Sequence, residues 1–448
     1  MAKAKPSSFT AIIVGGSVAG LTLAHTLSRA NINYILLEAR DTLSPNLGAG
    51  IVVMPNGARI LDQMGIWEPI NDVMTPMGIQ YRRRSDGTLV SQADFPKRVE
   101  ERLGYFSGIM ERQTFLQRLF EQLEDKSKVH LNKKVVSFNH DKEHVRVQCY
   151  DGSEFVGDIV VGADGIHSRT RQEMQRFAEE AGPQGMMDKD KTSITAQYNA
   201  FFGISEPLPY LSPGDAVVAS DINHSSLLFV SKHGLPQWFF FSKMDKCYQG
   251  KDIPRFNKAQ MEEQIDKFAN WKFSENVSLK DLMAKTSTLS YLPLEEATHN
   301  IWTYKRFVCV GDAIHKMTPN MGQGGNQAIE SAAALSNCLV EMLARSSDSV
   351  ITLANIEQAL QKYQKQRRKR AKLFVKLSGL VTRDETLDTL THTLRFLFLD
   401  PWTNFQMDLY TMAPYLTFLP LPGRTIGNKY WEAGMKNSTA SERPKARL

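Results

Sequence analysis

Residues 14–20, Val-Gly-Gly-Ser-Val-Ala-Gly, combine glycines with a hydroxyl side chain at a spacing that suits phosphate binding. A phosphate at a helix N-terminus is held by free backbone N–H groups and by the helix dipole, and glycines leave room for its approach. The dinucleotide pattern is GxGxxG, and here Ser17 stands at the middle glycine between Gly15 and Gly20. The segment therefore predicts a nucleotide site only with support from its surroundings.

The neighbouring residues give that support. Residues 9–14 have the composition of a buried strand, residues 18–30 carry apolar side chains at helical spacing, and a second apolar run stops at Glu38. Strand, glycine turn, helix, strand and acid form the βαβ unit of a nucleotide-binding fold. A carboxylate at Glu38 would accept hydrogen bonds from both ribose hydroxyls, which favours adenosine without a 2′-phosphate. The alternative is a glycine turn that closes an ordinary βα unit.

Two further segments follow strand-like runs. In residues 158–169, Asp164 and Gly165 enter a tight turn in which Asp164 can bond local backbone N–H groups. After residues 306–310, Asp312 stands where it could bond a polyol, and a loop poor in side chains, residues 322–325, leads into a helix that starts near Asn326. Such a loop lets a planar ring lie against the backbone, and the helix N-terminus faces negative charge of the kind that reduced flavin carries.

The spacing of these segments predicts an α/β fold in which a Rossmann-type nucleotide-binding domain is discontinuous. Aromatic and β-branched runs in residues 191–291 indicate an inserted mixed or antiparallel sheet, with one helix near residues 258–270. We also expect three strands in residues 129–161. The expected domains are residues 8–80, 102–185 and 300–345 for the nucleotide, residues 81–101 and 186–299 for the substrate, and a helical region, residues 346–448, with a disordered tail from residue 436.

Composition limits the classes of function. The chain has 448 residues, of which 42% are hydrophobic and 23% charged, and its net charge is +6. The local excess of Lys and Arg in residues 362–372 is interpreted as a solvated helix face, so no nucleic-acid partner is expected. Four irregularly spaced cysteines suit neither a metal nor a disulfide framework. They and an N-terminus without room for a signal peptide fit an intracellular protein, cytoplasmic or peripheral to the endoplasmic reticulum membrane.

The apolar residues 394–421 are interrupted by charges and prolines, so they do not predict a membrane-spanning helix. They could instead lie on a membrane or cover a substrate pocket. Together with the basic residues 365–372, this tract allows peripheral membrane association. The sequence does not indicate an oligomeric state.

The three glycine-containing segments, in this order, resemble the FAD-binding fingerprints of single-component flavoprotein aromatic hydroxylases, the group that includes p-hydroxybenzoate hydroxylase. The similarity extends to about residue 344. Within that group, residues 13–25, Leu37-Glu-Ala-Arg40, Pro55-Asn-Gly57 and residues 417–422 are most similar to fungal epoxidases of indole-diterpene and meroterpenoid pathways. The resemblance implies noncovalent FAD, NADPH or NADH as a transient reductant, and a flavin C4a-hydroperoxide that transfers one oxygen atom from O2 to a small hydrophobic substrate.

Carried over residue by residue, the resemblance makes Glu38 the ribose ligand and residues 48–52 a backbone strip beside the isoalloxazine. Arg112 would reach the FAD, Asp312 would bind its ribityl-pyrophosphate region, and residues 322–325 would line the flavin pyrimidine edge. The chain departs from the family pattern at Ser17, Val52 and Ser331, which affects the seating of the ring more than FAD binding. The expected cofactor-binding residues are Gly15, Ser17, Gly20, Glu38, Arg40, Gly48, Val52, Arg112, Asp164, Asp312, Pro319, Gly322, Gly324, Gly325 and Asn326.

Catalysis of this kind needs an apolar, closed pocket. One wall could come from the aromatic residues of the middle sheet, although we expect about half of them to face the protein core: Phe201, Phe202, Trp238, Phe239 and Phe240. No general acid or base stands out. His315 is interpreted as organising its loop, and Tyr198, His224 and His233 as structural or solvated.

Three hypotheses follow. The first is a monooxygenase that epoxidises or hydroxylates a prenylated terpenoid, meroterpenoid or indole-diterpene substrate. The second is another flavin enzyme on the same scaffold: an aromatic hydroxylase, a dehydrogenase, a reductase or a halogenase-like protein. A halogenase would need a Trp-x-Trp-x-x-Ile segment and a lysine near the flavin, and no such Trp pair is present. The third, a non-catalytic FAD-binding protein, would have damaged cofactor motifs, and here they are largely intact.

Overall fold

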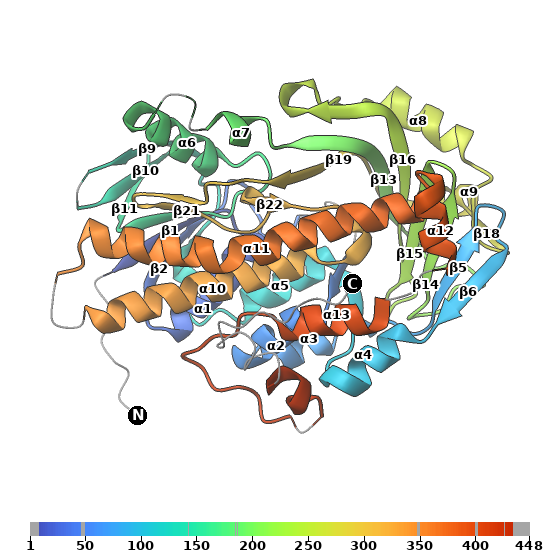
Figure 1. Ribbon diagram of the computed structural model, residues 1–448, viewed down its shortest axis with the longest axis horizontal. Coiled ribbons are helices and arrows are strands. Elements are labelled where there is room, and N and C mark those ends of the chain that lie inside the picture. The colour runs from blue at the N-terminus through green and yellow to red at the C-terminus, as the bar shows by residue number, and fades with distance from the viewer. Residues whose placement is uncertain are drawn as a thin grey trace.

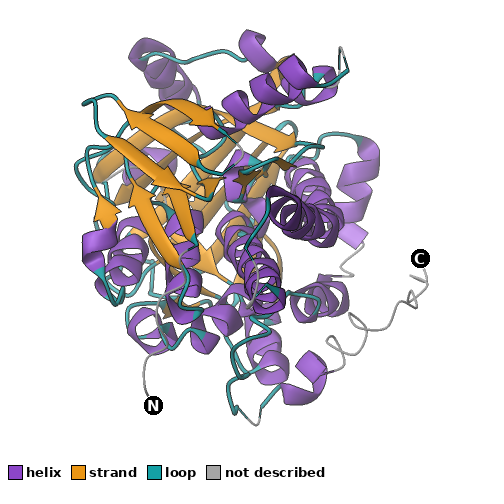
Figure 2. Cartoon of the chain, turned by 90° about the vertical axis from the view of Figure 1, so that its left-hand side faces the viewer, coloured by secondary structure: helices purple, strands orange, loops and turns teal. Residues whose placement is uncertain are grey.

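The computed structural model describes residues 9–432 with the exception of 46–49, 142, 184, 186, 347–349, 399–401 and 425. Gly48 and the expected tail from residue 436 therefore lie outside the described residues. Figure 1 shows the strands in two regions, with the long helix α11 (Leu353–Glu385) running along one face from the first region to the second. Several helices seen nearly end-on lie together beside the strands in Figure 2.

The first region contains a six-stranded sheet in the order β20-β21-β12-β1-β2-β8. Strand β1 (Thr10–Val14) lies between β2 (Asn33–Leu37) and β12 (Ile159–Gly162), and it is parallel to both. Its last four residues are buried, as expected for a parallel strand that is covered on both faces. The other strands are β8 (Val129–His130), β20 (Thr303–Tyr304) and β21 (Phe307–Cys309), of which β20 is antiparallel.

Helices α1 (Val18–Arg29) and α10 (Gly324–Arg345) pack against each other on this sheet. Gly20 allows α1 to begin directly after β1, because a Cβ at Gly20 would lie 1.9 Å from the carbonyl oxygen of Gly15. Helix α6 (Arg169–Ala181) contacts β12 and β21, and beside it lies a three-stranded antiparallel sheet of β9 (Val135–His140), β10 (Val145–Cys149) and β11 (Glu154–Gly157).

The second region is built on an eight-stranded sheet in the order β22-β19-β13-β16-β15-β14-β5-β6. Neighbouring strands are antiparallel except β14 and β5, so the sheet is mixed, as predicted. Its strands are β5 (Gln80–Arg84), β6 (Leu89–Ala93), β13 (Thr195–Ser205), β14 (Ala216–Asp221), β15 (His224–Val230), β16 (Pro236–Gln249), β19 (Thr286–Thr298) and β22 (His315–Lys316).

Shorter elements connect the two regions. A second three-stranded sheet consists of β3 (Gly50–Val53), β7 (Gly108–Glu111) and β4 (Thr75–Pro76), and β17 (Lys272–Ser274) pairs with β18 (Val277–Ser278). The other helices are α2 (Pro55–Gln63), α3 (Trp67–Asn71), α4 (Phe95–Leu103), α5 (Arg112–Glu121), α7 (Asp188–Lys191), α8 (Lys258–Lys267), α9 (Leu279–Met283), α12 (Leu390–Phe398) and α13 (Trp402–Thr411). The 3-10 turns are η1 (Lys126–Lys128), η2 (Gly250–Asp252), η3 (Gly311–Ala313) and η4 (Pro319–Met321).

The α/β fold is confirmed, and two sequence predictions need correction. Residues 129–161 form five strands instead of three, because the chain changes sheet twice, after β8 and at Asp158, whose Oδ2 accepts a hydrogen bond from Thr10 N over 2.7 Å. The basic residues 362–372 are not simply a solvated helix face, because Arg367 is 1% exposed and pairs with buried Glu330. In the described part of the chain, no helix combines the length and apolar character that crossing a membrane requires.

Candidate active site

The three predicted segments meet at the carboxyl edge of the six-stranded sheet. Val14 of β1 is in register with Leu37 of β2 and Gly162 of β12, and Gly162 is in register with Cys309 of β21. The turns that follow these four strands therefore lie side by side. Ligands of open α/β sheets bind at this edge.

Glu38 fixes the first of these turns. Its carboxylate accepts a hydrogen bond from Gly16 N over 2.7 Å and another from Arg40 N over 3.0 Å. The side chain is buried, yet it lines the large cavity described below. The acid thus holds the glycine turn against the end of β2 and still reaches the space where a ribose is expected.

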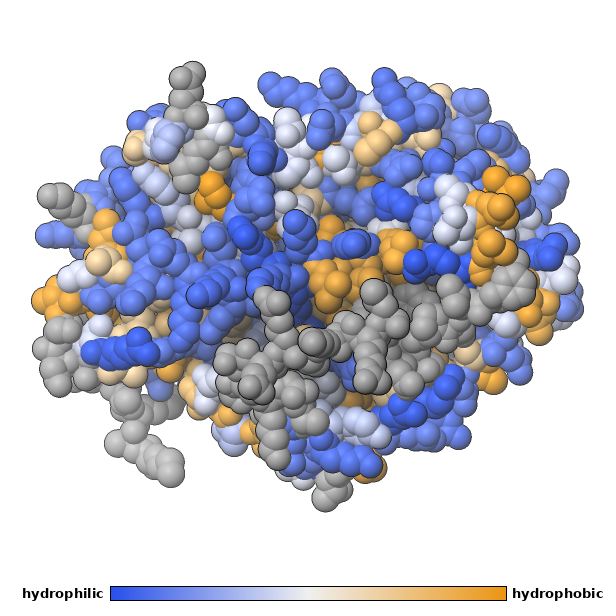
Figure 3. Space-filling view, in the orientation of Figure 1, coloured by the Kyte–Doolittle hydropathy of each residue, from blue (hydrophilic) through white to orange (hydrophobic). Residues whose placement is uncertain are grey.

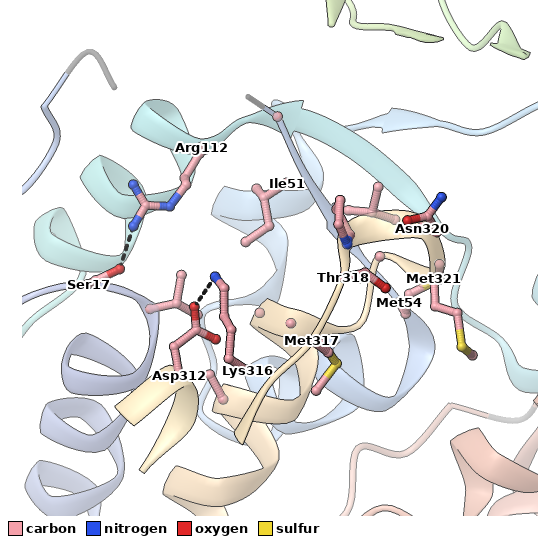
Figure 4. A pocket seen from close by; sticks show the side chains of 18 of the residues that line it. Ser17, Ile51, Met54, Arg112, Asp312, Lys316, Met317, Thr318, Asn320 and Met321 are labelled. Carbon is pink, nitrogen blue, oxygen red and sulfur yellow. Dashed lines mark hydrogen bonds and ion pairs between the residues drawn. The ribbon is translucent and has the colours of Figure 1, made fainter. Parts of the chain in front are cut away.

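The N-terminus of α1 is open towards the cavity. Ser17 occupies the N-cap position of α1, but its side chain makes no capping hydrogen bond to the helix. Ser17 Oγ instead accepts a hydrogen bond from Arg112 Nη2 over 2.7 Å. Figure 4 shows this pair at one side of the pocket. Burial lowers the pKa of Arg112 while Asp312 opposes the shift, and an arginine keeps its charge under such conditions. An arginine and a helix N-terminus facing one space fit a pyrophosphate.

Asp164 fixes the second turn. Its carboxylate accepts hydrogen bonds from Ser168 Oγ over 2.5 Å and from Thr170 N over 3.0 Å. The prediction that Asp164 bonds local backbone is confirmed. The adjacent Gly165 has a φ of +79° and no neighbour within 4 Å of an added Cβ, so the turn presents open backbone to the cavity.

Asp312 follows β21 and pairs with Lys316, whose Nζ lies 2.6 Å from Asp312 Oδ2. Both side chains are about one-third exposed, at 35% and 33%, and both line the cavity. Figure 4 shows Lys316 reaching over to Asp312 below the Arg112–Ser17 pair. Sequence reasoning missed Lys316, although its position four residues after Asp312 was a usable signal for an ion pair.

The glycine loop leads into α10, whose N-cap, Gln323, makes no side-chain cap either. A Cβ at Gly324 would meet no atom within 4 Å, so the start of this helix also faces open space. Asn326 holds the loop in place: its Nδ2 donates to Gly322 O over 2.8 Å and to Val52 O over 2.9 Å. This amide ties the glycine loop to strand β3, and both segments line the cavity described below.

One cavity of about 1410 Å³ joins these turns to the eight-stranded sheet. Most of the predicted cofactor-binding residues that the structure describes line it: Gly15, Ser17, Glu38, Arg40, Val52, Arg112, Asp164, Asp312, Pro319, Gly322, Gly324 and Gly325. Gly20 and Asn326 are not among its lining residues. These two residues position the segments that line the cavity. Gly20 allows α1 to pack closely against the turn at Gly15, and Asn326 holds the glycine loop by its hydrogen bonds.

The far part of the cavity has an apolar wall from the eight-stranded sheet, formed by Val218, Leu227, Phe229 and Phe239. Alternation along β16 sends the neighbouring Phe240 to the opposite face, where it stacks on Phe201 with ring centroids 4.8 Å apart. Phe201, Trp238 and Phe240 belong to a buried core. The expectation that only part of this aromatic set faces the cavity is confirmed.

Polar residues from distant segments also line this far part, and sequence reasoning missed them. They are Arg82 from β5, Asn320 from η4, Asp384 and Glu385 from the end of α11, and Arg395 from α12. No local spacing relates these positions, so only the adjacent acids at the end of an amphipathic helix offered a signal. Figure 3 shows hydrophobic side chains gathered on the surface beside the second half of α11, the half that carries the cavity-lining Leu377 and Leu380.

His315 does not line the cavity. It is fully buried, its Nε2 lies 2.8 Å from Ser331 Oγ, and burial lowers its pKa to about 4. Tyr198 is buried with its hydroxyl 3.3 Å from Thr386 Oγ1, and His224 Nδ1 lies 3.1 Å from Ser242 Oγ. These contacts give all three side chains structural roles.

The parallel sheet and the openings at its carboxyl edge place the protein among the dinucleotide-binding α/β proteins. Residues 8–378 match the family described as FAD binding domain. The FAD-dependent monooxygenase atmM of Aspergillus flavus is 36% identical over 422 residues, covering 93% of this chain and 88% of that protein. The FAD-dependent monooxygenase ausM of Penicillium brasilianum is 37% identical over 438 residues, covering 97% and 92%.

A variant of HpxO from Klebsiella pneumoniae, in complex with FAD, has the same fold, with a TM-score of 0.73 and 21% identity over 91% of this chain and 99% of that chain. The chain belongs to the FAD-binding-domain family, and it is an FAD-dependent monooxygenase whose cofactor is FAD. The open helix N-termini, the cavity-lining carboxylate of Glu38 and the Arg112 guanidinium fit this group.

Proposed function

We propose that the protein uses NADPH or NADH and O2 to epoxidise or hydroxylate a hydrophobic prenylated substrate of the terpenoid, meroterpenoid or indole-diterpene type, as part of fungal specialised metabolism. The observation that carries the proposal is the cavity of about 1410 Å³, which extends from the turns at the carboxyl edge of the six-stranded sheet to the apolar wall of Val218, Leu227, Phe229 and Phe239. A flexible prenyl chain matches a wall of this shape and chemistry.

We further propose roles for the cavity residues. Glu38 binds the adenosine ribose, with Arg40 beside it. The N-terminus of α1, with Arg112, binds the pyrophosphate, and Asp312 binds the ribityl chain. Gly50 to Val52 of β3 and the loop from Pro319 to Gly325 would line the ring. In this assignment residues 8–80, 102–185 and 300–345 hold the FAD, and residues 81–101 and 186–299 hold the substrate.

When bound, FAD accepts a hydride from the nicotinamide and activates O2, chemistry that side chains do not supply. The protein positions the reacting groups, excludes water from the cavity and stabilises charge electrostatically. The open N-terminus of α10 stabilises negative charge at the adjoining edge of the ring. The apolar wall excludes water, which limits the loss of oxygen as H2O2.

The first experiment combines the absorption spectrum of the purified protein with NADPH oxidation, measured with and without a prenylated indole or a phenolic meroterpenoid. Substrate-stimulated oxidation and a product heavier by one oxygen atom are the expected results. Oxidation that yields only H2O2 with every prenylated compound would contradict the substrate class. An epoxide is distinguished from an alcohol by its conversion to a diol in acid.

A further inference from the structure

A buried carboxyl group lies in the far part of the cavity, among the polar residues that face its apolar wall. Glu385, in the last turn of α11, lines the cavity although its exposed fraction is 8%. Its Oε2 accepts a hydrogen bond from Asn320 Nδ2 over 2.5 Å. Asn320 Oδ1 faces the Thr382 hydroxyl, which lies 2.7 Å away and also contacts Thr318 Oγ1 and Ser378 O, and its Nδ2 faces Glu385.

The charged and titratable groups around Glu385 come from three elements. Arg82 lies on β5, Asp384 is the preceding residue on α11, and His392 and Arg395 lie on α12. The two α12 groups are engaged by Asp384, because His392 Nδ1 lies 2.5 Å and Arg395 Nε 3.4 Å from Asp384 Oδ1. The charge of Arg82 favours the ionised form of Glu385, and the charge of Asp384 disfavours that form.

Burial raises the pKa of Glu385 to about 7, while the hydrogen bond from Asn320 and the charge of Arg82 lower it and Asp384 raises it. A neutral carboxylic acid is therefore available near neutral pH. Because Asn320 donates to Oε2, the proton of the neutral form resides on Oε1. A neutral carboxylic acid can do one thing that a carboxylate cannot: it donates a hydrogen bond.

Glu385 is close to the part of the cavity in which oxygen transfer is proposed. Its partner Asn320 directly follows Pro319 in η4, the turn that precedes the glycine loop, and both residues line the cavity. Figure 4 shows Asn320 beside Thr318 and Met54, at the end of the loop away from Arg112. A substrate group held by Glu385 would thus lie between the cofactor turns and the apolar wall.

We propose that Glu385, as a neutral acid, donates a hydrogen bond to an oxygen atom of the substrate. The preferred substrate class is then a hydrophobic molecule that carries one hydrogen-bond-accepting oxygen, a carbonyl above all, near the position that is oxygenated. This inference rests on the proposed function. Glu385 is a specificity-determining residue in it and takes no part in oxygen activation.

The test measures equilibrium binding to the FAD-loaded protein, followed by the flavin absorption spectrum, for two probes. One is farnesylacetone, whose ketone only accepts hydrogen bonds, and the other is the hydrocarbon in which a methylene replaces the carbonyl. At about pH 6 the wild-type protein is expected to bind the ketone about 2- to 10-fold more tightly, the range of one neutral hydrogen bond. At about pH 9 the carboxylate cannot donate, and the preference is expected to disappear.

Three variants separate donation from a structural effect. Glu385→Gln keeps a donor at every pH, so its preference for the ketone should persist at about pH 9. Glu385→Ala should show no preference at either pH. Glu357→Gln, on the same helix but away from the cavity, should behave as the wild type.

A ketone preference that survives in Glu385→Ala, or a wild-type preference that does not change with pH, would overturn the inference. If both probes bind equally and are oxygenated, the proposed function stands while the role of Glu385 fails. If neither probe binds to the FAD-loaded protein, the substrate class of the proposed function and the inference both fail.

Discussion

Glu330 and Arg367 form an ion pair of 2.9 Å in which the two side chains are 0% and 1% exposed. Arg370 pairs with the other oxygen of Glu330 over 2.6 Å, and Asn56 donates to that oxygen over 2.7 Å. Burial alone would raise the pKa of Glu330, but Arg370 and Arg367 lower it below its ordinary value. The cluster thus joins α2, α10 and α11 behind the glycine loop.

We predict that Glu330→Ala destabilises the protein by about 3–5 kcal/mol, because it leaves buried arginine charge without a partner. The measurement is the free energy of unfolding in urea. Glu341→Ala is the matched control on the same helix, since its carboxylate pairs with Lys362 and Arg345 at the surface. Glu341→Ala should lower the free energy of unfolding by less than about 1 kcal/mol. Equal losses in both variants would contradict the importance of the buried cluster.

Arg112→Ala is expected to weaken FAD binding by about 10- to 100-fold, the loss of charged hydrogen bonds of about 1.5–3 kcal/mol. Titration of the apoprotein with FAD, followed by the quenching of flavin fluorescence, gives the Kd. Arg118→Ala, on the same helix, removes a surface ion pair with Glu121 and should leave the Kd unchanged. An unchanged Kd in Arg112→Ala would remove this residue from the cofactor site.

Gly324→Ala should fold normally but should bind FAD at least about tenfold more weakly. A loss of about 1.4 kcal/mol of binding free energy corresponds to a tenfold change in Kd. An added Cβ meets no protein atom there but projects towards the proposed ring site. Gly423→Ala also meets no atom within 4 Å and lies away from the cavity, so it should change neither property. Thermal unfolding of the apoproteins and FAD titration compare the two variants.

Phe239 and Phe240 are neighbours with opposite expected effects. Phe240→Ala should destabilise the protein by about 3–5 kcal/mol, because Phe240 is fully buried in the core. Phe239→Ala should cost less stability and should raise the share of NADPH oxidation that ends as H2O2, because Phe239 lines the cavity. Urea unfolding and peroxide quantification test the pair, and a reversal of the two effects would mean that the register of β16 is wrong.

Stability should fall as pH rises from about 4.5 to about 7 through Glu385, whose pKa burial raises to about 7 in the folded protein. Over this pH interval the folded state binds more protons than the unfolded state. The stability that protonated Glu385 contributes is therefore complete below the ordinary pKa of glutamate and is lost as the pH rises through the pKa of Glu385 in the folded protein. At about pH 8, Glu385→Gln should therefore be more stable than the wild type by up to about 3 kcal/mol. At about pH 4 the two proteins should differ little.

Much of the fold followed from local patterns. The βαβ unit around Gly15 and Glu38, the mixed middle sheet and the helix after residues 322–325 were predicted because buried strands, amphipathic helices and glycine turns have characteristic spacings. The same patterns predicted the turns after the parallel strands, which meet at one edge of the sheet, while the family resemblance supplied other lining residues such as Val52 and Arg112.

The pattern of charges was a weaker guide. Residues 362–372 repeat Lys and Arg along a helix, and periodicity alone does not show that Arg367 turns inward to Glu330 while Arg368 stays exposed. The free energy of a buried charge depends on a partner, and here that partner lies 37 residues away on another helix.

The sequence by itself therefore determined the class of fold, the order of the FAD-binding segments and the carboxylate at the end of β2, because each of these follows from residues close together in the chain. The tertiary structure added the far part of the cavity, where Arg82, Asn320 and Glu385 from three separate elements face one space. It also made Glu385 a candidate donor, since its pKa depends on burial and on charges that distant segments bring to it.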